Sequence, residues 1–185
     1  MSTAFATPDV KTTWKIDGAH SAVEFAVRHL MIATVKGRFA DVQGTVVAPD
    51  DFTAPSIDVD VVIAAASIDT RQEQRDAHLR SADFFDVERF PTIAFKSRRS
   101  EAQPDGDLHV IGDLTIHGVT KEITLTVTPE GRGRDPWGGE RAGFSAKTTI
   151  NRHDFGLTWN QVLETGGLTV GTDIKISIDV ELVRA

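Results

Sequence analysis

Hydrophobic and polar positions alternate over most of this chain, and residues 107–128 (DLHVIGDLTIHGVTKEITLTVT) show the pattern most clearly. A short polar turn at residues 118–121 separates two apolar rows, Leu108, Val110, Leu114 and Ile116 before it and Ile123, Leu125 and Val127 after it. Because side chains on a strand switch faces at each residue, the segment predicts an antiparallel hairpin with one buried face.

Similar alternation predicts further strands at residues 14–17, 22–28, 35–47, 57–66, 92–97, 142–150 and 173–183. The phase of the third strand slips near residues 41–43, as a bulge would require. One segment departs from the strand period. Thr70 and Glu73 have the spacing of a capping box, and the residues that follow suit a short helix.

The predicted fold is therefore all-β with one short inserted helix, in about eight or nine antiparallel strands. With 185 residues, the chain suits one domain. We expect a flexible tail at residues 1–12 and a single β-barrel over residues 13–185. Closing the sheet removes its exposed edges, and a barrel of about eight strands can hold one small ligand. A two-sheet sandwich would produce the same pattern and remains the alternative.

Composition narrows the possible classes of partner. The chain has no cysteine, which excludes disulfides and thiolate chemistry, and its net charge of −7 argues against binding to nucleic acid. No segment reaches the apolar length of a membrane span, and the first residues do not have the pattern of a signal peptide. We expect a cytoplasmic protein, or an exported one if a leader has been removed.

Common catalytic motifs are absent from the sequence. It contains no HExxH, GxSxG, P-loop or GxGxxG pattern, and its six histidines are scattered. We therefore expect no catalytic residues, no metal and no cofactor.

Two groups of side chains could lie at a barrel mouth. Arg28, His29, Lys36 and Arg38 flank the apolar stretch HLMIAT and could meet an anionic headgroup, although ordinary solvated charge would look the same. Trp137 stands beside two glycines in DPWGGER, where it could act as a gate or as a structural plug over one end.

Several segments together carry a resemblance to a known family: WKIDGAHSAVEFAVRHL (14–30), VKGRF (35–39), SIDT (67–70), RDAHLRSADFFD (75–86), PTIAFKS (91–97), GDLTIHGVTK (112–121) and DPWGGERAGFSA (135–146). In this order and spacing the chain resembles the YceI-like family, lipocalin-like proteins associated with polyisoprenoid binding. The resemblance implies an antiparallel lipocalin-like β-barrel with an elongated apolar cavity. It also implies a long isoprenoid ligand, such as a polyprenyl phosphate or a quinone-type tail.

Strand phase, rather than the resemblance, indicates which side chains face inward. The candidates for the ligand-binding lining are Val23, Phe25, Val27, Phe39, Val61, Ile63, Phe95, Leu114, Ile116, Leu125, Phe144, Ile176 and Ile178. Alternation alone does not show a lipid, because a core filled by its own side chains would give the same string.

Three functions remain open on these grounds. The first is non-catalytic binding, transport or storage of a long isoprenoid lipid. The second is an enzyme acting on such a lipid, and the third is a structural or interaction barrel without lipid. A homodimer is possible in each case.

Overall fold

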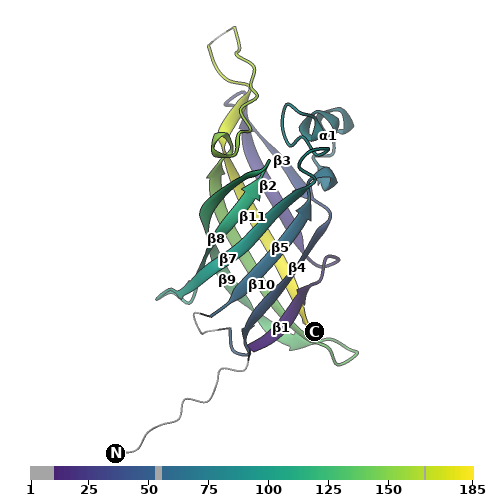
Figure 1. Ribbon diagram of the computed structural model, residues 1–185, viewed down its shortest axis with the longest axis vertical. Helices are drawn as coiled ribbons and strands as arrows, with labels where there is room; N and C mark the ends of the chain where they lie inside the picture. Colours follow the sequence, from purple (N-terminus) through teal and green to yellow (C-terminus); the bar gives the residue numbers. More distant parts are fainter. Residues whose placement is uncertain (1–10, 53–55, 165) are drawn as a thin grey trace, which may run out of the picture.

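The computed structural model describes residues 11–52, 56–164 and 166–185. Within them the chain forms one antiparallel barrel (Figure 1). Its elements are β1 (Lys11–Ile16), β2 (Ala22–His29), β3 (Ala33–Phe39), β4 (Val42–Pro49), β5 (Asp58–Ala64), η1 (Ala65–Ser67), β6 (Ile68–Asp69), α1 (Glu73–Arg80), β7 (Thr92–Ala102), β8 (Leu108–Ile116), β9 (Val119–Arg134), β10 (Glu140–Asn151), η2 (Arg152–Phe155) and β11 (Val170–Arg184).

Eight strands make the closed ring, in the order β1-β4-β5-β7-β8-β9-β10-β11, and β1 pairs with β11 to complete it. The long strand β11 has two partners on the same side. Its last residues pair with β1, whereas residues 170–179 pair with β2. In consequence β1 and β2 follow one another along the same wall, and so do β3 and β4. The predicted eight-stranded barrel is confirmed, and the sandwich alternative is excluded.

The phase slip near residues 41–43 is the break between β3 and β4. Residues 11 and 12, which we expected in the flexible tail, belong to β1, and Thr12 is buried. The rest of the expected tail, residues 1–10, lies outside the described residues.

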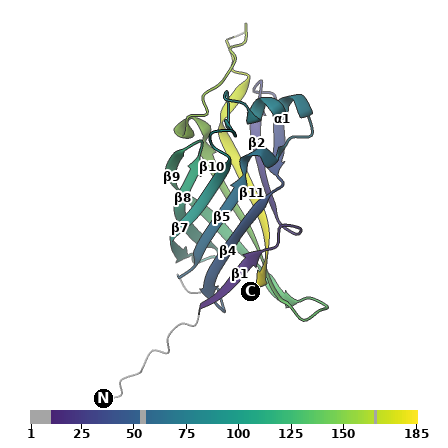
Figure 2. The same ribbon diagram turned by 45° about the vertical axis from the view of Figure 1, so that its right-hand side comes forward.

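The barrel has two distinct ends (Figures 1 and 2). We name the end beside α1 and the β2–β3 turn the upper end, and the end beside the C-terminus and the β9–β10 turn the lower end. The register of β11 separates them, because Val170 pairs with His29 and Val183 pairs with Arg141. At about 3.3 Å per residue, these two pairs are roughly 40 Å apart along the strand.

The predicted helix exists, but its predicted cap is wrong. The helix α1 begins after Gln72, whose side chain accepts a hydrogen bond from the Arg75 N–H. Thr70 donates instead to the Asp76 carboxylate, through its backbone N–H at 2.9 Å and its hydroxyl at 2.5 Å. The spacing of Thr70 and Glu73 therefore does not produce a capping box. Thr70 hydrogen-bonds to the buried Asp76 carboxylate of α1 instead, and Gln72 is the N-cap.

Candidate functional site

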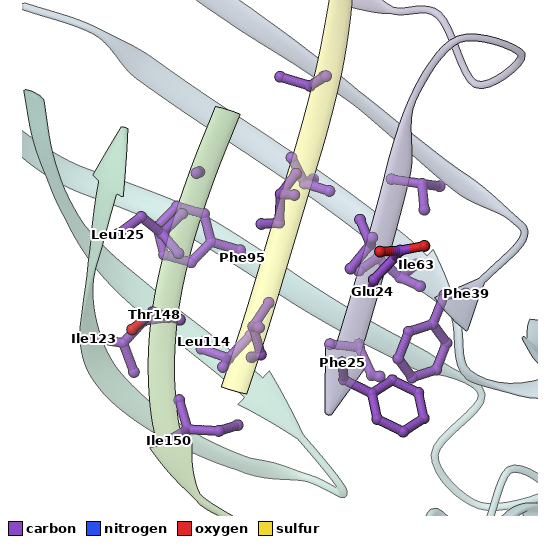
Figure 3. A pocket seen from close by; sticks show the side chains of 18 of the residues that line it. Glu24, Phe25, Phe39, Ile63, Phe95, Leu114, Ile123, Leu125, Thr148 and Ile150 are labelled. Atoms are coloured by element: carbon purple, nitrogen blue, oxygen red, sulfur yellow. The ribbon is translucent and has the colours of Figure 1, made fainter. Parts of the chain in front are cut away.

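An apolar cavity of about 270 Å³ lies inside the barrel (Figure 3). Its lining comes from the inward rows of the strands on all sides, from Leu182 near the lower end to Val170 near the upper end of β11. Two packed clusters contribute, one around Trp14 and Phe144 and one around Phe95 and Leu114. The surface that the cavity presents is carbon, so it suits an apolar guest.

All thirteen side chains that strand phase placed inside border this cavity. They are Val23, Phe25, Val27, Phe39, Val61, Ile63, Phe95, Leu114, Ile116, Leu125, Phe144, Ile176 and Ile178. Their contact with a ligand remains a prediction. The structure adds residues that the alternation did not mark, notably Leu79 of α1 and Phe84 and Phe85 from the turn that follows this helix.

Aromatic side chains fill the lower end. Trp14 is fully buried and its ring centroid lies 5.2 Å from that of Phe52, which in turn lies 4.9 Å from Phe144. The Arg132 guanidinium stacks over Trp14 and Phe52 at 5.2 and 5.5 Å from the ring centroids. These stacked rings, with a cation over them, make the lower end the closed end of the cavity.

The upper end is covered by two segments from different parts of the chain. Phe84, which lines the cavity, stacks with Trp159 at 5.2 Å, and His78 lies 4.7 Å from Trp159 and 5.1 Å from Phe84. The imidazole of His78 is also 2.8 Å from the Asp83 carboxylate. These three rings join α1 and the turn that follows it to residues 156–164 across the mouth.

The α1 helix is held to the barrel by polar contacts, because few of its side chains are apolar. Arg80 donates to the backbone carbonyls of Ala66 and Ile68, each at 2.8 Å. Arg75 donates to the Thr70 hydroxyl at 2.7 Å and to its carbonyl at 2.9 Å. The helix therefore lies as a cover that is attached mainly by polar contacts and adds one side chain, Leu79, to the apolar lining.

Arg152 is a buried charged residue that sequence reasoning missed. It is 3% exposed, and its guanidinium donates to the carbonyls of Gly171, Leu157, Trp159 and Val170. Burial lowers the pKa of this guanidinium from its usual value, although arginine stays protonated in proteins. The signal in the sequence was its position two residues after Ile150, in phase with the inward row.

The five predicted mouth residues do not form one group. Arg28, Lys36 and Arg38 lie on the solvent-facing side of β2 and β3, and the Arg38 side chain is 3.3 Å from the Asp69 carboxylate. His29 ends β2 at the upper end. Trp137 is 88% exposed in the β9–β10 turn, at the lower end, so it neither plugs the cavity nor joins the cations. None of the five borders the cavity.

An ion-pair network lies outside the barrel at the lower end. Arg141 contacts the carboxylates of Asp17, Asp135 and Glu181. Hydrogen bonds from His20 and then from Arg141 lower the pKa of Asp17 far below its usual range, and Arg141 also lowers the pKa of Asp135. Asp17 in turn raises the pKa of His20.

Three donor groups of this network, on Asp17, His20 and Glu181, lie within 4.8 Å of one another, which is close enough to share a cation. Arg141 already supplies a positive charge to both carboxylates. The arrangement is therefore satisfied as an ion-pair network that fixes the β1–β2 connection against β10 and β11.

No α-helix among the described residues has the length and apolar character needed to span a bilayer.

Comparison with known proteins agrees with this architecture. Residues 14–182 match the YceI-like domain. A UPF0312 protein of Staphylococcus aureus is 39% identical over 176 residues, which span 92% of this chain and 96% of that protein. The crystal structure of a YceI protein from Campylobacter jejuni is 32% identical, with a TM-score of 0.73, covering 85% of this chain and 90% of that one.

A second solved structure shares the fold at lower identity. It is described as a polyisoprenoid binding domain from Saccharophagus degradans, implicated in plant cell wall breakdown. It is 16% identical with a TM-score of 0.67, and the match covers 94% of this chain and 99% of that domain. From the match to the family domain over almost the whole barrel and the close relatives, this chain belongs to the YceI-like family.

Proposed function

We propose that this protein binds a long isoprenoid lipid in its barrel, without catalysis, as a carrier or store. The observation that carries the proposal is the carbon-lined cavity, closed by aromatic rings below and covered by a separate segment above. Transfer of apolar surface from water is worth roughly 25 cal/mol per Å², so a branched hydrocarbon chain gains most of its binding free energy from such a lining. The shared fold with a polyisoprenoid binding domain supports the same ligand class.

The cavity must widen to take a long chain. Its volume of about 270 Å³ is near the lower limit of sites for small molecules, which range from about 300 to 1,000 Å³. The lining is mainly Leu, Ile, Val and Phe, which can change rotamer, and the α1 cover is attached by polar contacts. Uptake by side-chain movement and displacement of the cover is the route that we infer.

An enzyme acting on the lipid would need a titratable group that faces the guest. The described carboxyl groups with lowered pKa are Asp17, Asp69, Asp135 and Glu140. None of these four borders the cavity. Glu24 and Asp179 border it but are exposed, and Arg152 already donates to four carbonyls. This arrangement favours binding over chemistry.

Two neighbouring valines on β5 offer a matched test. Val61 borders the cavity, whereas Val62 is 42% exposed on the outer face. Val61→Trp should fill part of the cavity and weaken binding of a polyprenyl lipid at least tenfold, while Val62→Trp should bind as the unaltered protein does. Titration from detergent micelles, together with mass spectrometry of solvent extracts, measures both. Equal binding by the two variants would place the lipid elsewhere, and no binding by the unaltered protein would refute the proposed function.

A further inference from the structure

Exposed apolar side chains gather at the upper end of the barrel. Among the described residues, six large hydrophobic side chains are exposed. Four of them, Met31, Ile32, Val162 and Leu168, come from the β2–β3 turn and from the segment made of residues 156–164 and 166–169. Figures 1 and 2 show both segments projecting beyond the barrel at the end away from the C-terminus. We name these four side chains the apolar tip.

The two segments of the apolar tip are joined to each other and to the cavity. The Leu30 N–H donates to the Thr169 carbonyl at 2.9 Å, and His29 pairs with Val170. Val170 and Val27, two residues before His29, both border the cavity. The apolar tip is therefore the continuation of the cavity wall beyond the end that α1 covers.

The β2–β3 turn places apolar residues in backbone conformations and in solvent exposure that such residues disfavour. It runs from His29 to Ile32, with a hydrogen bond from the Ile32 N–H to the His29 carbonyl at 3.1 Å. Its two central residues have positive φ, 51° for Leu30 and 59° for Met31. A turn with two positive φ values favours Asn and Gly, so Leu and Met carry a conformational cost here. Met31 and Ile32 are also 60% and 80% exposed. A site that departs from local preference and from burial at once is a candidate for function.

Local charge indicates the surface that this tip contacts. Residues 22–39 carry Arg28, Lys36 and Arg38 against the single carboxylate Glu24, a net charge of +2, whereas the whole chain carries −7. The other segment of the tip adds one exposed carboxylate, Glu164, which leaves the tip with a net positive charge. Arg28 and Lys36 are exposed and form no ion pair with a carboxylate of the described residues. The Arg28 guanidinium donates to the Met31 carbonyl at 2.6 Å, which keeps this charge next to the tip.

We propose that the apolar tip inserts into the interface of an anionic lipid bilayer, with Arg28 and Lys36 contacting lipid headgroups. Apolar side chains that project beside cations are the combination that binds such interfaces, and each basic side chain near the surface adds attraction. The cations of β2 and β3 beside the tip then face the bilayer, so the protein docks in one orientation. Resting on the proposed function, this places the covered end of the cavity against the membrane from which the lipid is taken.

Flotation with vesicles tests docking separately from lipid uptake. The vesicles are phosphatidylcholine alone, or phosphatidylcholine and phosphatidylglycerol in equal amounts. We expect the full chain to float with the second kind and to detach as salt is raised. The double variant Met31→Gly, Ile32→Thr should weaken vesicle binding at least about tenfold, because burying each aliphatic side chain in the interface contributes at least about that factor. Glycine suits the positive φ, so the double variant should melt no lower than the unaltered protein.

Two controls separate the causes. The Val62→Thr variant loses an exposed apolar side chain from β5, far from the tip, and should float with the vesicles as the unaltered protein does. Lys36→Glu should reduce the preference for phosphatidylglycerol. The double variant should still take up polyprenyl lipid from detergent micelles, whereas Val61→Trp should fail at uptake but still float. Unchanged flotation of the double variant, or no flotation of the unaltered protein, would overturn the proposal. A fall in sedimentation mass of the double variant without vesicles would overturn it also, because the tip would then join two copies of the chain.

Discussion

Arg152 provides the sharpest test of how the upper end is held together. Its guanidinium is the shared donor to Leu157 and Trp159 on one side and to Val170 and Gly171 on the other, at 2.5, 2.9, 3.3 and 2.8 Å in that order. Replacing it with methionine keeps an unbranched chain of similar reach and removes every donor. The carbonyls of Leu157, Trp159 and Gly171 then lose this donor inside a region where Arg152 itself is 3% exposed, whereas the Val170 carbonyl keeps a hydrogen bond from the Asn160 side-chain amide at 2.7 Å.

The expected loss follows from those contacts. Three of the bonds are 2.9 Å or shorter. A hydrogen bond to a charged group contributes about 1.5–3 kcal/mol net, which gives about 4–5 kcal/mol for three bonds at the lower value. Removing a buried charge that has no carboxylate partner returns part of its desolvation cost, which offsets part of this loss. Arg152→Met should therefore lower the free energy of unfolding by about 3 kcal/mol, or the melting temperature by about 6–12 °C at this chain length.

Chemical denaturation gives the free energy of unfolding, and hydrogen exchange locates the change. Exchange should accelerate first in residues 156–164 and 166–171, which Arg152 joins. Arg152→Lys keeps the charge but has one compact ammonium group in place of the planar guanidinium. Its free energy of unfolding should therefore lie between those of the unaltered protein and Arg152→Met. Arg38→Met is the control, because Arg38 is exposed and its contact is one surface ion pair. It should change stability by no more than about 0.5 kcal/mol. A loss below about 0.5 kcal/mol for Arg152→Met would refute the reasoning.

Three further changes test other parts of the structure. Gly112→Ala should cost about 1–3 kcal/mol of stability by denaturation, because a Cβ there would approach the Lys96 carbonyl and the Ser97 Cα closer than real contacts allow. Gly133→Ala is the control and should leave the stability unchanged, because a Cβ at this position would meet open space. Arg141→Gln should lower the melting temperature most at neutral pH. Since Arg141 helps to lower the pKa of Asp17 and Asp135, its stabilisation exists above their unfolded value of about 3.9 and disappears as pH falls below it. Melting curves across this range should show the gap closing on acidification, and a constant gap would contradict the network. His78→Ala should release the α1 cover and speed lipid exchange severalfold in a transfer assay without reducing the amount bound.

The inward face of the barrel could be read from the sequence because strand alternation is a local property. Once Leu114 and Ile116 are on one face, every second neighbour follows, and all thirteen predicted positions do border the cavity. Arg152 also continues the inward row of Ile150, but a charged residue is rarely buried, so the alternation alone did not place it inside. The resemblance to the YceI-like family added the closed topology, which alternation alone leaves open between a barrel and a sandwich.

Tertiary structure decided everything that depends on which strand ends meet. Trp137 and Arg28 both lie in or next to a predicted turn with polar neighbours, so the sequence does not separate them. The antiparallel register of β11 puts them at opposite ends of the barrel. Thr70 binds Asp76 rather than capping the helix, and Trp159 reaches His78 and Phe84 from another part of the chain. The Trp159 contacts join residues far apart in sequence, and the free energies of all these contacts depend on geometry that the alternation pattern does not contain. The alternation determined what lies inside, and the closure of the sheet decided where the cavity opens.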